Sequence, residues 1–265
     1  MQAYKWLQMV KLNSKALKHC KNCNTVLHGL YCSHCGQKAN IERITLSFIW
    51  HELFHFFTHL EKGFLFTTGQ MLTRPGITAK KFIDGKRKNY QPPVSYFLIW
   101  ITVYILSLYL ITKFFGDNVV INYKEYFGPA ATTKFAISHL SIVLTIIIPF
   151  HSLYLYLLVT RKNYNYFESM VAVIYSLGTL ISLQFVFAIV ALVIHLITRG
   201  SIDLKISDFL KVLYLGWFIT DTIRLYPVKL KLVRVIVYII LAFGTFTVWR
   251  LYAFPELVKV FHPYQ

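Results

Sequence analysis

Length, composition and charge set the class of this protein. The chain has 265 residues, of which 56% are hydrophobic and 15% are charged, and its formal net charge is +17. The apolar residues come in long blocks, and no polar layer is left to cover a soluble core of this apolarity. These features exclude an ordinary soluble globular protein. They predict an all-α membrane protein with a strongly basic surface.

The first feature in chain order is a set of four cysteines, the only ones in the sequence: Cys20, Cys23, Cys32 and Cys35. They form two Cys-x-x-Cys pairs. Each pair can place two thiolates on one small turn, and two facing turns make the closed tetrahedral cage of a structural zinc. Gly36 allows the second turn to fold back toward the sulfurs. Two disulfides and four free thiols are the alternatives; we favour zinc as the cofactor because nothing else in the chain needs cross-linking.

This zinc ribbon also indicates where the N-terminal region lies. Zinc bound by thiolates is typical of a reducing compartment, which places this end of the chain in the cytoplasm. Six lysines accompany the cysteines: Lys5, Lys11, Lys15, Lys18, Lys21 and Lys38. We expect this basic surface to neutralise anionic membrane lipids. Nucleic acid is not expected as a partner, because the ribbon offers few aromatic residues on which bases stack.

The segment 44–72 is expected to form one or two amphipathic helices that lie along the bilayer. It contains a His-Glu-x-x-His motif, in which His51 and His55 share a helix face and could ligate zinc, with Glu52 as general base. His59 lies on the same side as a candidate third ligand. We favour an interfacial helix that contains histidines by chance, since Asp and Glu together number only 11 and no further acidic ligand stands out. A membrane-embedded zinc metalloprotease is the alternative.

A basic turn precedes the first apolar block. It begins with Arg74-Pro75-Gly76, and its cluster Lys86, Arg87 and Lys88 is followed by Tyr90. The cluster should lie at headgroup depth, where these four residues are candidates for binding a lipid headgroup or phosphate. A simple positive-inside anchor of the membrane topology is the interpretation that we favour.

These motifs carry a family resemblance. The Cys-x-x-Cys…Cys-x-x-Cys-Gly-Gln start, the Arg-Pro-Gly turn and the Gly-Lys-Arg stretch followed by Tyr and Pro resemble a family of uncharacterised bacterial multi-pass inner-membrane proteins. The resemblance extends to the start of the first apolar block and continues beyond it only by hydropathy. It implies the bacterial inner membrane as location and no reaction, substrate or partner. The segment His51 to His55 is not among the family's motifs.

Five candidate transmembrane helices follow, most of them near the ~20 residues needed to cross ~30 Å of hydrocarbon. They are Val94–Phe115, Phe135–Val159, Ser169–Thr198, Phe209–Tyr226 and Leu232–Phe254. The fourth is the weakest, since Lys211, Asp221 and Arg224 interrupt it. The third is long enough that it must tilt, bend near Gly178 or project from the bilayer.

Two polar residues inside these blocks are candidates for function, because they are costly in hydrocarbon. His151 follows Pro149 by two residues, and Asp221 can form an i,i+3 pair with Arg224. A lipid-handling or small-solute permease would need a cavity that contains one of them. The spans show no internal repeat or paired broken helices, so an ion-coupled transporter is not indicated.

The sequence therefore predicts three regions: a cytoplasmic zinc ribbon with its basic segment (1–40), interfacial helices with the basic turn (41–92) and a five-span bundle (93–265). Basic residues are denser in the loops on the N-terminal side, which places the N-terminus in the cytoplasm. We expect a non-enzymatic inner-membrane scaffold or adaptor whose ribbon docks a protein partner. The sequence does not identify that partner.

Overall fold

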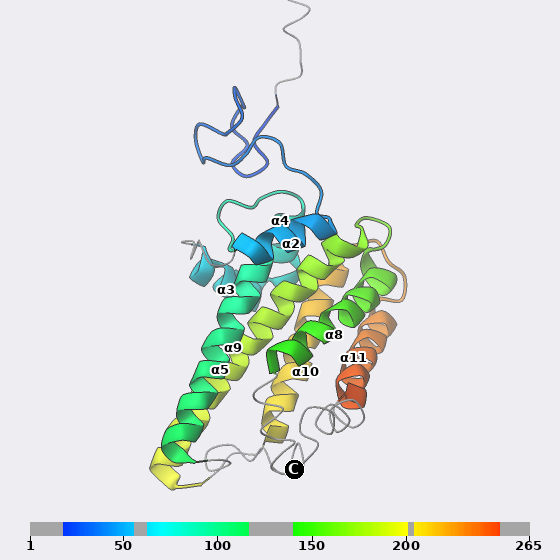
Figure 1. Cartoon of the computed structure of the whole chain (residues 1–265). Helices are drawn as coiled ribbons and strands as arrows, with labels where there is room; N and C mark the ends of the chain where they lie inside the picture. Colours follow the sequence, from blue (N-terminus) through cyan, green and yellow to red (C-terminus); the bar gives the residue numbers. More distant parts are fainter. Residues whose placement is uncertain (1–17, 56–62, 117–139, 201–203, 250–265) are drawn as a thin grey trace, which may run out of the picture.

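The structure, a computed structural model, describes residues 18–55, 63–116, 140–200 and 204–249. Within these ranges the regular structure is helical, apart from two isolated β-bridges near the cysteines, His19 to Val26 and Tyr31 to Lys38. Figure 1 shows the ribbon (18–40) and three short helices at one end of a bundle of longer helices. The predicted helical architecture is confirmed in this part of the chain.

Three short helices follow the ribbon: α2 (Leu46–His55), α3 (Phe64–Thr73) and α4 (Pro75–Ile83). On α2 the exposed apolar residues Leu46, Trp50 and Leu53 fall at helical spacing and form one stripe. Phe48, on the opposite side, and Ile49, beside the stripe, pack against the core. The exposed polar residues Ser47 and His51 lie on the remaining side, so α2 is amphipathic, as the sequence predicts for an interfacial helix.

The described ranges contain five longer helices: α5 (Pro93–Phe115), α8 (Leu140–Leu155), α9 (Tyr166–Thr198), α10 (Leu204–Arg224) and α11 (Lys231–Val248). One π-helical turn, η2 (Tyr156–Thr160), continues α8. Successive helices alternate in direction, so α5, α9 and α11 begin at the ribbon end, where α8 and α10 finish (Figure 1).

α9 lies at the centre of the bundle and packs against α4, α5, α8 and α10. A capping box fixes its start: the Asn165 side chain accepts from the Glu168 N–H, and the Glu168 carboxylate accepts from the Asn165 N–H, both at 2.8 Å. Gly178 allows α5 to approach, since a Cβ there would lie 2.8 Å from the Tyr96 ring. The predicted third span is one continuous helix, in which Gly178 serves close packing.

The predicted number of five spans is not confirmed. In the described ranges, three helices are long and apolar enough to cross a membrane: α5, α9 and α11. The apolar stretch Thr145–Thr160 of α8 and η2 is shorter, and charged residues interrupt α10. The predicted boundaries at Phe135 and Phe254 lie outside the described residues. Three candidate spans nevertheless indicate a membrane protein.

The Arg74-Pro75-Gly76 turn brings α4 against α10. Pro75 is the first residue of α4, where its fixed φ suits the helix and its missing N–H costs nothing. The Asp221 carboxylate of α10 accepts from the N–H of Gly76 at 2.8 Å and of Ile77 at 3.2 Å. A Cβ at Gly76 would lie 2.5 Å from Thr222 N, so glycine is required for this approach.

Asp221 is therefore a helix cap between two elements and not half of the predicted pair with Arg224. Its carboxylate satisfies two of the N–H groups that a helix leaves open at its start, and the helix dipole favours a negative charge at that position. This contact ties an interfacial helix to a helix of the bundle.

Replacing Gly76 by Ala should destabilise the protein by roughly 1–3 kcal/mol, because the new Cβ overlaps the backbone of Thr222. Gly69→Ala is the matched control: a Cβ at this α3 position meets no atom within 4 Å, and alanine is favoured in a helix by roughly 0.5–1 kcal/mol. Thermal unfolding midpoints in detergent should move in opposite directions. A Gly76→Ala midpoint at or above that of the wild type would contradict the packing of α4 on α10.

Candidate metal centre and its junction with the bundle

The ribbon consists of two turns with the same backbone hydrogen bonds. In the first turn, the N–H of Cys20 donates to Thr25 O at 2.8 Å, and the N–H of Asn24 donates to Cys20 O at 2.9 Å. In the second turn, the N–H of Cys32 donates to Gln37 O at 2.8 Å. Each turn therefore holds its two thiols in the same relative positions, as a metal knuckle requires.

The residue after each Cys-x-x-Cys pair has a positive φ, 64° for Asn24 and 70° for Gly36. Glycine and asparagine are the residues that adopt this conformation most readily. Sequence reasoning identified Gly36 and missed Asn24. Each of the two residues directly follows the last cysteine of its pair, and this equal spacing is the signal that would have identified Asn24.

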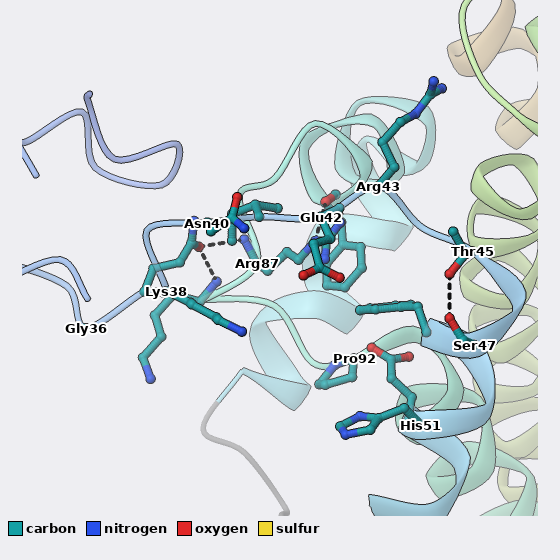
Figure 2. Close-up of a pocket in the computed structure, with 16 residues that line it drawn as sticks. Gly36, Lys38, Asn40, Glu42, Arg43, Thr45, Ser47, His51, Arg87 and Pro92 are labelled. Carbon is teal, nitrogen blue, oxygen red and sulfur yellow. Dashed lines mark hydrogen bonds between the residues drawn. The ribbon is translucent and has the colours of Figure 1, made fainter. Parts of the chain in front are cut away.

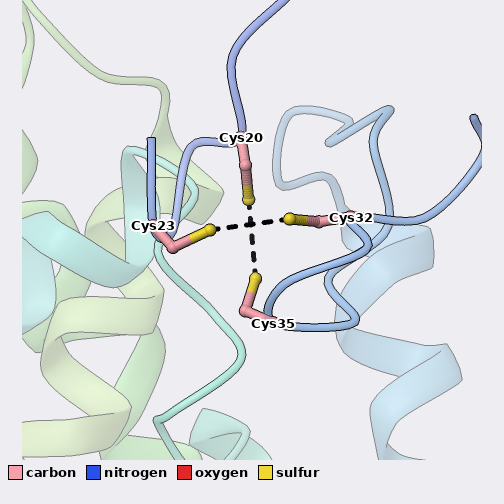
Figure 3. Close-up of side chains that lie close together, drawn as sticks. All are labelled: Cys20, Cys23, Cys32 and Cys35. Atoms are coloured by element: carbon pink, nitrogen blue, oxygen red, sulfur yellow. Dashed lines mark hydrogen bonds between the residues drawn. The ribbon is translucent and has the colours of Figure 1, made fainter. Parts of the chain in front are cut away.

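The four sulfur atoms converge on one point (Figure 3). All lie within 4.8 Å of one another, and the distances are 3.6 Å for Cys20–Cys35 and 3.5 Å for Cys23–Cys32. Four thiolates at about 2.3 Å from a zinc ion would be about 3.8 Å apart in a tetrahedron, whereas a disulfide needs about 2.05 Å. The donor set therefore fits a four-coordinate metal ion with no open position, and the predicted ligands are brought together.

The thiols differ in their tendency to lose a proton. Hydrogen bonds with Thr25 lower the pKa of Cys23 to about 5. Burial raises the pKa of Cys35 to about 11. A metal ion must displace the proton from Cys35, so the metal affinity of this centre should fall as the pH falls.

One side chain of the ribbon, Gln37, joins it to the loop between α4 and α5. Its Nε2 donates to Gly85 O at 2.8 Å, and its Oε1 accepts from the N–H of Arg87 at 3.0 Å and of Lys88 at 3.1 Å. Gln37 is buried, as is Gly85, whose φ of 109° favours glycine. The Cys-Gly-Gln and Gly-Lys-Arg motifs are therefore direct contact partners.

Arg87 occupies the centre of this junction. Its guanidinium lies over the rings of Phe48 and Phe82 at 4.9 and 5.4 Å, within the range of cation–π attraction. It also donates to Glu42 O at 3.0 Å. Burial lowers the pKa of Arg87, but an arginine pKa lies so far above neutral that the group stays charged. Arg87 thus holds the ribbon linker, α2 and α4 together.

The four predicted headgroup ligands do not converge. Lys86 and Lys88 are exposed, whereas the Arg87 side chain turns inward. Tyr90 is buried, and its ring packs on Phe66 with centroids 5.4 Å apart. Lipid binding by the whole cluster stays a prediction, but the structure gives its members different surroundings.

A second tie, which sequence reasoning missed, connects the ribbon linker to α9. Arg43 donates to Glu168 through Nε at 3.0 Å and a terminal nitrogen at 2.9 Å, the bidentate geometry of strong arginine–carboxylate pairs. The Asn165 side chain donates to Ile44 O at 3.0 Å. The residues that cap α9 therefore also hold the linker.

A pocket of about 620 Å³ lies between the ribbon, α2 and the 85–92 loop (Figure 2). His51 and Glu52 of the His-Glu-x-x-His motif line it. The His55 side chain and His59 lie outside the described residues, so a metal site at this motif stays a prediction. Among the residues that the structure describes, only the four cysteines bring three or more metal-donor atoms together.

The two polar candidates of the bundle face different neighbours. His151 is buried beside the rings of Tyr154 and Tyr238, at centroid distances of 6.2 and 6.4 Å. Asp221 faces α4. The structure therefore does not bring them into one site.

Comparison with known proteins adds one finding. A family model described as "Protein of unknown function (DUF3667)" matches residues 61–105. The matched stretch contains the Arg-Pro-Gly turn, the Gly-Lys-Arg loop and the start of α5, and it does not reach the cysteines. No curated protein and no solved structure matches the chain.

Proposed function

We propose that this protein is a non-enzymatic scaffold or adaptor of the bacterial inner membrane, with a zinc ribbon that docks a cytoplasmic protein. The observation that carries the proposal is the closed cage of four thiolates on a unit that Gln37 holds against the bundle. Four protein ligands leave a zinc ion no position for water or substrate, which is typical of a structural site. The metal then serves to hold a surface in shape.

The ribbon offers a surface suited to a protein partner. Leu30 and Tyr31, between the two cysteine pairs, are 82% and 63% exposed. Aromatic residues such as Tyr31 are enriched among those that supply most of the binding energy at the centre of protein interfaces, and Leu30 adds apolar area beside it. Their place on a small metal-braced turn favours docking of a partner over contact with the bundle.

Two independent arguments support a cytoplasmic ribbon. Thiolate-bound zinc is typical of a reducing compartment. The loops and helix ends on the ribbon side of the bundle also carry many basic residues, as positive-inside orientation requires: Lys80, Lys81, Lys86, Arg161, Lys162, Arg224, Lys229 and Lys231.

A zinc metalloprotease is the second candidate, because His51 and Glu52 line a pocket. Such an enzyme needs a second metal ion, held by histidines and independent of the cysteines.

Counting metal ions in the purified protein separates the two functions. The scaffold predicts one zinc per chain, lost in Cys20→Ser and in Cys32→Ser, because a missing thiolate removes binding free energy of order 10 kcal/mol that also folds the ribbon. His51→Ala is the control and should leave the metal content unchanged. Two zinc ions per chain, one of them retained in the cysteine variants and lost in His51→Ala, would favour the protease.

Cysteine labelling in intact cells tests the orientation. Lys113, in the last turn of α5, and Lys229, between α10 and α11, lie at opposite ends of the bundle. With the ribbon in the cytoplasm, Lys113→Cys should react with an impermeant thiol reagent while Lys229→Cys stays at the level of the parent protein. The reverse pattern would contradict the cytoplasmic ribbon.

A further inference from the structure

The pocket at the junction has a position and a charge pattern that the scaffold function does not use. It opens between Gly36 and Lys38 of the ribbon and His51 and Pro92 on the side of the bundle (Figure 2). We propose that this pocket binds the phosphate group of an anionic phosphate ester, supplied by a lipid headgroup at the membrane surface.

Four cations line the pocket: Lys38, Arg43, Arg87 and Lys88. Arg43 is paired with Glu168, so three of them are left for a ligand. Lys38 and Lys88 are exposed, and neither forms an ion pair with a carboxylate in the described part of the chain. They come from the ribbon and from the loop, and the hydrogen bonds of Gln37 hold these two backbones together. Arg87, packed between two rings, supplies a fixed third charge. The site is therefore assembled only when the ribbon is docked.

The opposing charges are fewer. Two carboxylates, Glu42 and Glu52, also line the pocket. The charge of Arg43 is balanced by Glu168, which lies outside the lining. The remaining three cations outnumber the two carboxylates by one, so the single negative charge of a phosphate diester would neutralise the site. Attraction by these cations is the main recognition that a phosphate requires.

Neutral donors complete the site. Thr45 and Ser47 line the pocket at the start of α2, and their hydroxyls hydrogen-bond to each other at 2.8 Å. α2 has ten residues, and the positive end of its dipole adds to the attraction for an anion. The side chains of the pocket thus supply both charge and hydrogen bonds to phosphate oxygens.

The surroundings favour a lipid as the source of the phosphate. Leu46, Trp50 and Leu53 form the exposed stripe of α2, with exposed fractions of 47%, 53% and 37%. A helix with such a stripe and a basic surface beside it is typical of the membrane interface, where the headgroup phosphates lie. The pocket would then take a headgroup while the stripe contacts the acyl chains.

The test is lipid retention by the full-length protein in native mass spectrometry, with phosphatidylglycerol and with phosphatidylcholine. Lys38→Gln combined with Lys88→Gln should weaken phosphatidylglycerol binding by about fivefold for each charge removed, from roughly 1 kcal/mol per basic residue at a membrane surface. Lys81→Gln with Lys162→Gln is the matched control, since both residues lie at the same end of the bundle, outside the pocket and outside the predicted headgroup cluster. It should change binding less than twofold.

A second arm identifies the source of the phosphate. Glycerol phosphate, which has no acyl chains, is titrated against the wild type and both double variants. If only lipid binding depends on Lys38 and Lys88, the phosphate comes from a lipid headgroup. If the binding of glycerol phosphate depends on them as well, the ligand is a free phosphate ester. Equal weakening by the two variant pairs in the lipid arm, or no weakening by the pocket pair in either arm, would overturn the site. Metal content equal to that of the wild type shows that the ribbon is intact in each variant.

Discussion

The contact between Gln37 and the backbone of residues 85–88 is the interaction on which the rest of the structure depends. Gln37 belongs to the second cysteine turn, where its own carbonyl accepts from Cys32 N–H at 2.8 Å. Its side chain makes three further hydrogen bonds to the loop. Each is worth about 0.5–1.5 kcal/mol, and a buried N–H left without its acceptor costs more. Gln37 therefore closes the second cysteine turn with its backbone and joins this turn to the 85–88 loop with its side chain.

Two series of contacts connect this junction to the bundle. In one, Arg87 holds the linker, α2 and α4, and α4 is fixed to α10 by the Asp221 cap. In the other, Arg43 ties the linker to Glu168 at the start of α9. The Cys-Gly-Gln, Gly-Lys-Arg and Arg-Pro-Gly motifs all take part in these contacts, so their residue types follow from packing between the ribbon, the interfacial helices and the bundle.

Local patterns in the sequence predict much of this structure. The cysteine spacing predicts the convergent thiols, and hydropathy predicts α5, α9 and α11 as candidate spans. The partners of Asp221 and Glu168 are not predictable in this way, because they are 145 and 125 residues distant and no periodicity links them. The predicted count of five spans is not confirmed for α8 and α10; in α10 the charge of Asp221 serves a contact with α4 that hydropathy does not detect. The predicted division of the chain into three regions, with boundaries at residues 40 and 92, stays a prediction.

Hydrogen exchange at the N–H groups of Arg87 and Lys88, with and without chelation of the bound metal, tests the central claim most directly. If the metal holds the second cysteine turn in the conformation that places Gln37 against the loop, exchange at both N–H groups should accelerate on chelation. It should accelerate equally in metal-loaded Gln37→Ala. The N–H of Thr179, in the core of α9, should stay protected in both cases. Thr25→Ala, at the matching position of the first turn, should leave both groups unchanged. Unchanged exchange at Arg87 and Lys88 after complete metal removal would contradict the account.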